Sequence, residues 1–130
     1  MNAYEFIKNC YPFYFLTISD GLPQGRPFGA IYFCKDKYYV ATRANGNVCN
    51  QVKANPAVQL VALKEGTRNW LRLSGNATIC EDLQLKEQML GACPILSKHY
   101  SSPLDEKFAM IEITPTAIDY HGVDGVEILL

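Results

Sequence analysis

Three short stretches of this sequence combine residue types that bind anions or planar ligands. The first is Arg26, Pro27, Phe28 and Gly29, where a guanidinium and an aromatic ring flank a proline that cannot donate to a sheet. Since Gly29 also leaves a side-chain void, the stretch is typical of a sheet edge or of a place where a ligand approaches the backbone. A bulge near a hairpin explains the same residues equally well.

The second stretch follows a predicted strand at Thr42 and Arg43 and opens a short helix near Asn47. Free backbone N–H groups at a helix start, a hydroxyl and a guanidinium together suit a phosphate. Gln51 and Lys53 lie on the same helix, but residues two apart diverge in direction, so only one of them need reach an anion. An ordinary capped helix after a strand is the alternative interpretation.

The third stretch alternates, so that Trp70, Arg72 and Ser74 share one face of a predicted strand and Leu71 and Leu73 share the other. A buried Arg72 needs an anionic partner, which can be a carboxylate of the protein, a group across a subunit interface or a ligand. Tryptophan and arginine are also enriched at protein interfaces. The stretch therefore indicates either an interface or a ligand contact.

The elements that must position these stretches are short strands separated by turn signals, a pattern that favours an all-β barrel or sandwich with a few short helices. Helices are expected over residues 2–9, from about 47 to 54, and from a cap at Asp82 to about 90. A turn is expected over 20–24, and the end of the chain, 123–130, is ambiguous. Strands are expected over 13–19, 25–33, 38–42, 58–63, 68–80, 108–114 and 117–120.

The composition of the sequence limits the classes of protein to which the chain can belong. With 130 residues, 48% hydrophobic and 19% charged, the chain is expected to form one domain over residues 1–130. A net charge of -1 provides no positive field for phosphate backbones, which disfavours general nucleic-acid binding. No apolar run is long enough to span a membrane or to act as a signal peptide, so a cytoplasmic location is expected.

Cysteine and histidine usage predicts no metal site. The five cysteines include no CxxC pair, so we expect reduced, mostly buried thiols rather than disulfides or zinc ligands. The two histidines, His99 and His121, have no second histidine or carboxylate at metal-ligand spacing. No dinucleotide, serine-hydrolase or zincin motif occurs, and no residue stands out as catalytic.

Four stretches, in their order and spacing, resemble one family: residues 25–30, 39–42, 51–56 and 70–75. It is the pyridoxamine 5'-phosphate oxidase-like FMN-binding split-barrel family, and the likeness covers roughly residues 13–79. The resemblance implies a mainly β fold, a Greek-key split β-barrel. It also implies a homodimer with one FMN at each of two sites shared between the subunits. The branch most similar in these stretches is the small bacterial group that includes nitroimidazole-resistance reductases.

The resemblance also implies which residues contact FMN. Those along the isoalloxazine ring would be Arg26, Pro27, Phe28 and Gly29. Trp70 and Arg72 would approach from the partner chain, with Trp70 as a wall of the pocket.

Around the phosphate, the resemblance implies Thr42, Arg43, Asn47, Gln51 and Lys53. Relatives often carry a basic residue at the start of this helix, where this chain has Gly46 and Asn47. We therefore expect Arg43 to supply the missing positive charge; if it does not, the affinity for the phosphate must come from backbone donors and Lys53.

The function that the resemblance implies is a flavin-dependent oxidoreductase that passes electrons from a reduced nicotinamide to a small organic acceptor. Arg26 and Arg72 would stabilise negative charge on the reduced flavin or the substrate. The alternative is a non-catalytic carrier or sensor that binds flavin, a deazaflavin, or haem through His99 or His121. Pyridoxamine phosphate is not the expected substrate, because too little sequence follows the barrel to display a basic substrate-phosphate cluster.

Overall fold

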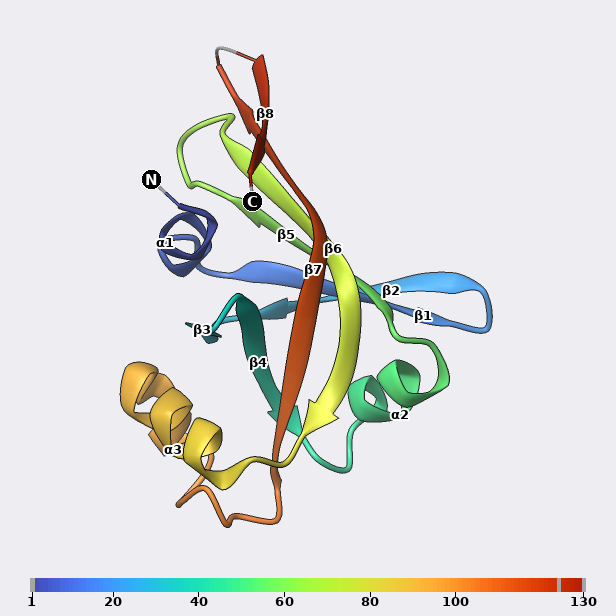
Figure 1. Ribbon diagram of the computed structural model, residues 1–130, viewed down its shortest axis with the longest axis vertical. Helices are drawn as coiled ribbons and strands as arrows, with labels where there is room; N and C mark the ends of the chain where they lie inside the picture. Colours follow the sequence, from blue (N-terminus) through green and yellow to red (C-terminus); the bar gives the residue numbers. More distant parts are fainter. Residues whose placement is uncertain (1, 124, 130) are drawn as a thin grey trace.

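Eight antiparallel strands form one curled sheet in the computed structural model, which describes residues 2–123 and 125–129 (Figure 1). Their order is β2-β1-β5-β6-β7-β4-β3, with β8 paired to β7. This is the mainly β, split-barrel fold that the sequence predicts. The strands are β1 (Phe13–Ser19), β2 (Leu22–Phe28), β3 (Ile31–Cys34), β4 (Lys37–Arg43), β5 (Ala57–Leu63), β6 (Trp70–Cys80), β7 (Phe108–Gly122) and β8 (Gly125–Leu129).

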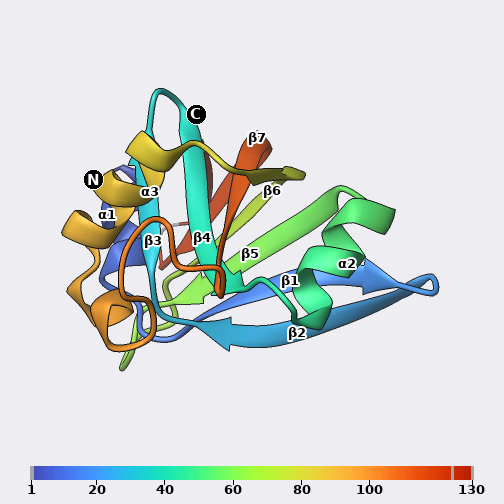
Figure 2. The same ribbon diagram turned by 90° about the horizontal axis from the view of Figure 1, so that it is seen from below.

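The helices lie against the sheet on different sides (Figure 2). They are α1 (Ala3–Lys8), α2 (Asn47–Ala54), α3 (Leu83–Ala92) and a short 3₁₀ helix, η1 (Pro94–Lys98). Side chains cap two of them: Asn2 Oδ1 accepts from the Glu5 N–H at 2.8 Å, and Asp82 Oδ1 accepts from the Leu85 N–H at 3.1 Å. The predicted helices are confirmed to within about two residues at either end.

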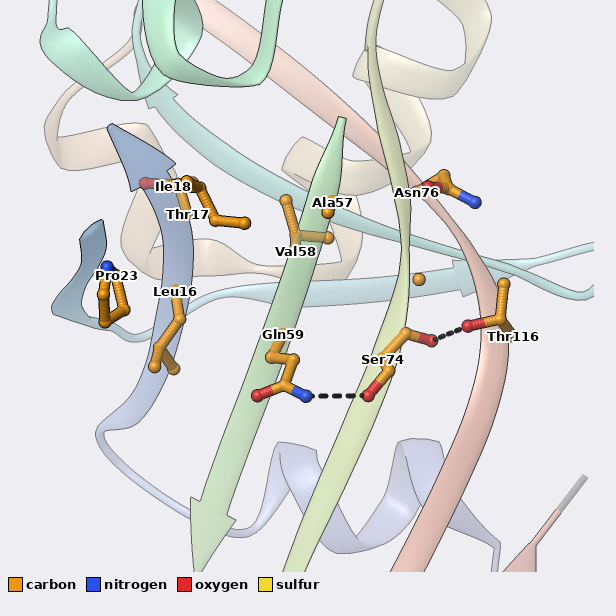
Figure 3. A pocket seen from close by; sticks show the side chains of 11 residues that line it. Leu16, Thr17, Ile18, Pro23, Ala57, Val58, Gln59, Ser74, Asn76 and Thr116 are labelled. Carbon is orange, nitrogen blue, oxygen red and sulfur yellow. Dashed lines mark hydrogen bonds between the residues drawn. The ribbon is translucent and has the colours of Figure 1, made fainter. Parts of the chain in front are cut away.

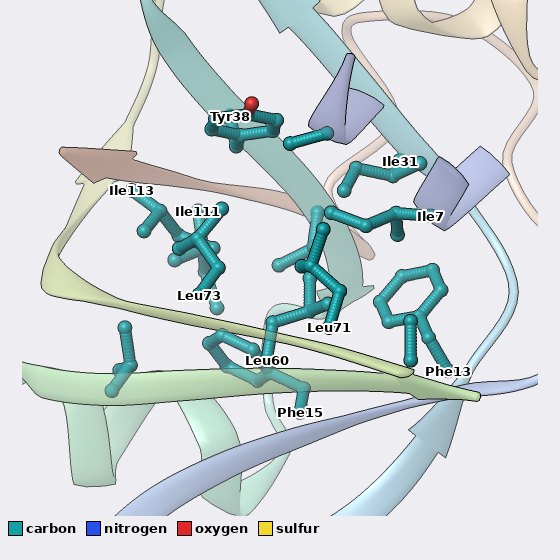
Figure 4. Packing of buried hydrophobic residues seen from close by; sticks show 14 of the residues in the cluster. Ile7, Phe13, Phe15, Ile31, Tyr38, Leu60, Leu71, Leu73, Ile111 and Ile113 are labelled. Atoms are coloured by element: carbon teal, nitrogen blue, oxygen red, sulfur yellow. The ribbon is translucent and has the colours of Figure 1, made fainter. Parts of the chain in front are cut away.

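Two apolar clusters stabilise the sheet, and strand alternation decides which side chains enter each. The main cluster fills the barrel and takes alternate residues of the central strands, while α1 and α2 bury their apolar sides in it (Figure 4). The second cluster lies on the other side of β3, β4 and the start of β7, under α3 and η1. The outward side of β1, β2 and β5 faces neither cluster.

The prediction for residues 20–33 is wrong in its boundaries. The hairpin closes at Asp20 and Gly21, whose φ angles of 53° and 78° are those of a tight two-residue turn, so β2 starts earlier than expected. Residues 25–33 are also not one strand, because Gly29 and Ala30 separate β2 from β3. The alternation of side chains along β2 therefore ends at Phe28.

The prediction of two strands over 108–114 and 117–120 is also wrong, because β7 continues through Pro115. A register shift between Ser74 and Gly75 on β6 accommodates the proline opposite Gly75. A methyl group at Gly75 would overlap the Thr114 carbonyl oxygen, so the close approach of the two strands needs glycine. The first half of β7 pairs with β4, and its second half pairs with β8, the segment that the sequence left ambiguous.

All five cysteines are free thiols, as predicted, and three of them are buried: Cys10, Cys49 and Cys93. Burial raises the pKa of each of these three thiols. Within the described ranges, no group of three or more histidine, cysteine or acidic side chains is placed to hold a metal ion. The same ranges contain no helix long and apolar enough to cross a membrane.

Candidate functional site

Arg26 is held in a polar cluster between β1, β2 and α2. Its Nη1 donates to the Phe15 carbonyl oxygen at 3.1 Å and to Thr17 Oγ1 at 2.9 Å. Its Nη2 donates to Gln51 Oε1 at 2.9 Å, and the Thr17 hydroxyl donates to the same Gln51 oxygen. Thr17 is only 1% exposed, so one end of the guanidinium lies inside the protein.

Among the residues that the structure describes, no carboxylate balances the charge of Arg26. The ion pairs among the described residues are Lys37 with Glu112 and Arg72 with Asp119, so every protein partner of Arg26 is neutral. Burial lowers the pKa of the Arg26 guanidinium from its ordinary value, but arginine stays charged in proteins. A partly buried cation with neutral partners favours the binding of an anion.

A hollow of about 560 Å³ opens between α2 and the β1–β2 hairpin, beside this cluster. Gln51 lines it, and so does Asn47, which is one helical turn away at the start of α2. The cap position of α2 is Gly46, which has no side chain to bond the first N–H groups of the helix. These free N–H groups therefore lie within one turn of the residue that binds Arg26.

The structure separates the other residues that were predicted to surround a phosphate. Thr42 shares the barrel-facing side of β4 with Val40, whereas Arg43 points to the other side and is exposed. Burial raises the pKa of Tyr100, and the nearby positive charge of Arg43 opposes that rise. Lys53 lines hollows on the far side of α2, toward the end of β6, so Gln51 and Lys53 diverge as expected.

The segment that was predicted to follow the isoalloxazine ring divides between three environments. Phe28 packs in the main cluster, with its ring stacked on Phe15 at 5.3 Å between centroids. Pro27 points outward in register with Tyr14. The side-chain void at Gly29 is occupied by the ring of Tyr11, which a methyl group there would overlap. β2 is an edge strand of the sheet, one of the two alternatives that Pro27 indicated.

A second polar cluster lies on the outward face of β6 and β7. The rings of Trp70 and His121 stack in parallel, 3.9 Å apart with an interplanar angle of 2°. Arg72 Nη2 pairs with Asp119 Oδ2 at 3.1 Å, and its guanidinium carbon lies 5.4 Å from the Trp70 ring centroid. The sequence predicted that Arg72 needs a partner, and the structure identifies a carboxylate of the same chain.

The family model of pyridoxamine 5'-phosphate oxidase matches residues 2–122 of this sequence. The chain belongs to this family. A NimC/NimA family protein from Clostridium acetobutylicum is 30% identical, with a TM-score of 0.89 over 98% of this chain and 88% of that one. General stress protein 26 from Bacillus anthracis is 22% identical, with a TM-score of 0.80 over 97% and 93%.

A pyridoxamine 5'-phosphate oxidase-related, FMN-binding protein from Nostoc punctiforme has the same fold, at 14% identity and a TM-score of 0.69 over 88% and 75% of the two chains. No protein of curated function matches this sequence. The family suspected from the four sequence stretches is thus confirmed.

Within the family fold, the predicted cofactor residues fall on opposite sides of the sheet. Residues paired across β1, β5 and β6 share a face, and the row through Phe15, Leu60 and Leu73 points into the barrel. The next row, through Tyr14, Val61 and Arg72, points outward. Arg26 and Gln51 therefore lie on the barrel side, Trp70 and Arg72 lie on the outer side, and a single chain does not bring the two groups together.

Three residues that complete the two clusters were not predicted from the sequence to make these contacts: Thr17, Asp119 and His121. For Thr17 a local signal exists, because it is the polar member of a buried alternation with Phe13 and Phe15. The pairing of Asp119 and His121 with β6 depends on the register of β7, which no local pattern reveals.

Proposed function

We propose that this chain binds FMN, with the phosphate held by Arg26, Gln51 and the first N–H groups of α2. The observation that carries the proposal is the unbalanced charge of Arg26, whose hydrogen-bond partners are all neutral. Membership of the pyridoxamine 5'-phosphate oxidase family supports it, as does the likeness to an FMN-binding protein of the same fold. In this proposal Arg26 supplies the positive charge that the sequence led us to expect from Arg43.

The hydrogen bonds around Arg26 prepare it for an anion. Thr17 and the Phe15 carbonyl fix the guanidinium without neutralising it, so its charge and its remaining N–H groups are available. Gln51 Oε1 accepts hydrogen bonds from both Arg26 and Thr17. Because the oxygen of the Gln51 amide faces these two residues, its NH₂ group points away from them and can donate to a ligand. Asn47 adds a second amide one turn closer to the helix start.

The proposed activity is that of a cytoplasmic, flavin-dependent oxidoreductase acting on a small organic molecule. Bound FMN would supply a carrier for electrons between a reduced nicotinamide and that acceptor. In a homodimer, Trp70 and Arg72 would come from the partner chain. Because Asp119 already pairs with Arg72, this cluster would offer directed N–H groups and a flat aromatic surface rather than net charge.

The test of cofactor binding is the visible spectrum of the purified protein, followed by titration with FMN. An oxidised-flavin spectrum, or saturable uptake of FMN with quenching of flavin fluorescence, is the expected result. A colourless protein that takes up no FMN would overturn the proposal. A Soret band would instead indicate haem.

The test of turnover is anaerobic stopped-flow mixing of the flavin-loaded protein with a reduced nicotinamide. Bleaching of the flavin absorbance, and its return when an acceptor is added, is the expected result. A flavin that stays oxidised would point to the carrier or sensor instead of the enzyme.

A further inference from the structure

The indole of Trp70 is covered on one face by the imidazole of His121. The two residues are register partners on β6 and β7, and their rings stack in parallel with centroids 3.9 Å apart. The other aromatic pairs among the described residues have centroids 4.8 to 6.4 Å apart, and none is as nearly parallel. A third ring cannot enter so close a stack, so a planar ligand reaches this face of the indole only if His121 leaves it.

The stacked position leaves His121 without a hydrogen bond at Nε2. This nitrogen is buried and has no hydrogen-bond partner among the described residues. A neutral imidazole nitrogen either donates or accepts a hydrogen bond, so Nε2 is unsatisfied in either tautomer. Contact between the two rings, rather than a hydrogen bond at Nε2, therefore holds His121 on the indole. Release of the imidazole into solvent would restore the missing hydrogen bond.

His121 can leave the indole without disturbing the core. Both stacked rings are partly exposed, and the pair lies where β6 begins and β7 approaches its end. The neighbouring Tyr120 points to the other side of β7, where its ring packs against Phe6 of α1. His121 itself belongs to neither apolar cluster. Rotation of the His121 side chain toward solvent therefore leaves both clusters intact.

The hollow farther along β6 offers no comparable surface for a ring. It has a volume of about 400 Å³ and lies along β1, β5 and β6 (Figure 3). Gln59 Nε2 donates to Ser74 Oγ at 3.1 Å, and Thr116 Oγ1 donates to the Ser74 carbonyl oxygen at 3.2 Å, so its polar groups are partly satisfied internally. None of the described residues that line it is aromatic. A flat ligand on the outward side of β6 therefore depends on Trp70 for stacking.

We infer that His121 is a displaceable cover of Trp70, which leaves the indole when the isoalloxazine ring of FMN stacks there. The inference rests on the proposed function, in which Trp70 is a wall of the flavin pocket. The fused ring system of the flavin contacts more of the indole than an imidazole does, and the exchange relieves the unpaired Nε2. The neighbouring Arg72 and Asp119 cancel each other's charge, which suits the uncharged oxidised ring. His121 therefore lowers the affinity of the pocket, because FMN binds only the molecules in which the indole is uncovered.

Two substitutions of His121 should change FMN affinity in opposite directions. His121→Ala uncovers the indole, so FMN should bind about fivefold more tightly, because no cover has to leave. His121→Phe keeps a stacked ring that has no unpaired nitrogen, so the cover is more stable and the affinity should fall about fivefold. His99→Ala, at the exposed histidine that follows η1, is the control and should bind FMN as wild type does. Titration of the full-length proteins by flavin fluorescence measures these affinities.

Fluorescence of the flavin-free protein tests the cover directly. Trp70 is the only tryptophan of the chain, so its emission reports on this stack alone. Acrylamide should quench the emission of His121→Ala more efficiently than that of wild type, and that of His121→Phe no more than that of wild type. Equal quenching of wild type and His121→Ala would overturn the inference.

Weaker FMN binding by both His121 variants would also overturn it, since His121 would then contact the flavin itself, and so would unchanged affinities. Circular dichroism and thermal unfolding identify a variant that fails to fold, and the other variant then decides. Lumiflavin, which has the isoalloxazine ring but no phosphate, separates the two proposals. If wild type binds no FMN, the proposed function is wrong, and lumiflavin binding by the same variants tests the cover. Failure of His121→Ala to bind lumiflavin as well would overturn both proposals.

Discussion

Arg26 on β2 and Arg72 on β6 belong to one sheet, but they differ in what balances their charge. Arg72 pairs with Asp119 at 3.1 Å on the outward face, where both side chains keep partial contact with solvent. Arg26 points to the barrel side, and its partners in the described part of the chain are a hydroxyl, an amide and a carbonyl oxygen. The chain therefore neutralises the charge of Arg72 by itself and leaves the charge of Arg26 unbalanced.

The largest effect is expected from Arg26→Gln, which removes the unbalanced charge. FMN affinity should fall about 100-fold, equivalent to about 2.7 kcal/mol, since charge-assisted hydrogen bonds to the phosphate are lost. The melting temperature of the flavin-free protein should also fall, because the hydrogen bonds of Arg26 to the Phe15 carbonyl, Thr17 and Gln51 are lost although no ion pair is broken. Titration by flavin fluorescence and thermal unfolding measure the two quantities. Arg68→Gln, in the exposed β5–β6 connection, is the control, and equal affinities for the two variants would contradict the assignment.

Thr17→Val tests whether the neutral partners orient Arg26. The substitution keeps the shape of a buried side chain but removes the hydroxyl between Arg26 and Gln51. We expect FMN affinity to fall about fivefold, close to the roughly 1 kcal/mol of one hydrogen bond. In the Arg26→Gln background the same substitution should change the affinity far less. Additive losses in the double variant would mean that Thr17 acts independently of Arg26.

A double-mutant cycle with Arg72→Gln and Asp119→Asn tests the ion pair between Arg72 and Asp119. Urea unfolding should give a coupling free energy of about 0.5 kcal/mol, a low value because the pair is partly exposed and water screens it. The Asp119→Asn variant alone leaves Arg72 unpaired, as Arg26 is. If the coupling were zero, the ion pair would not distinguish the two arginines.

The smallest effect is expected from Arg43→Ala. The Arg43 side chain is exposed and lies on the Tyr100 side of β4, away from the barrel side where Thr42 points. FMN affinity should therefore change by less than about twofold, within what a distant surface charge contributes. A loss of FMN affinity comparable to that of Arg26→Gln would mean that the phosphate binds at the turn before α2. The proposed difference between Arg26 and Arg72 would then be wrong.

Strand and helix positions were predictable because alternation and caps are local properties of the sequence. β1 matches its predicted bounds, and Asp82 caps α3 as expected. The wrongly predicted boundaries of β2 and β7 have a different origin. The tight turn at Asp20 changes where β2 begins, and the bulge opposite Pro115 lets β7 run on; both depend on how distant segments pair.

The candidate site shows the same division between local and non-local information. Arg26, Gln51, Trp70 and Arg72 were identified by their residue types, and each lies in a polar cluster. What the sequence does not encode locally is which of them meet. Gln51 joins Arg26 across 25 positions of the chain, and Asp119 joins Arg72 across 47. Those contacts, rather than residue types, decide which arginine keeps an unbalanced charge.

The buried thiols give each helix its own reporter of detachment from the barrel. Cys10 follows α1, Cys49 lies within α2 and Cys93 ends α3, and burial raises the pKa of all three. Because only an exposed thiolate reacts with alkylating reagents, each cysteine is modified at the rate at which its own helix opens. Pulse labelling followed by mass spectrometry would therefore time the opening of α1, α2 and α3 separately. FMN should slow the labelling of Cys49 the most, since α2 is the helix proposed to hold the phosphate.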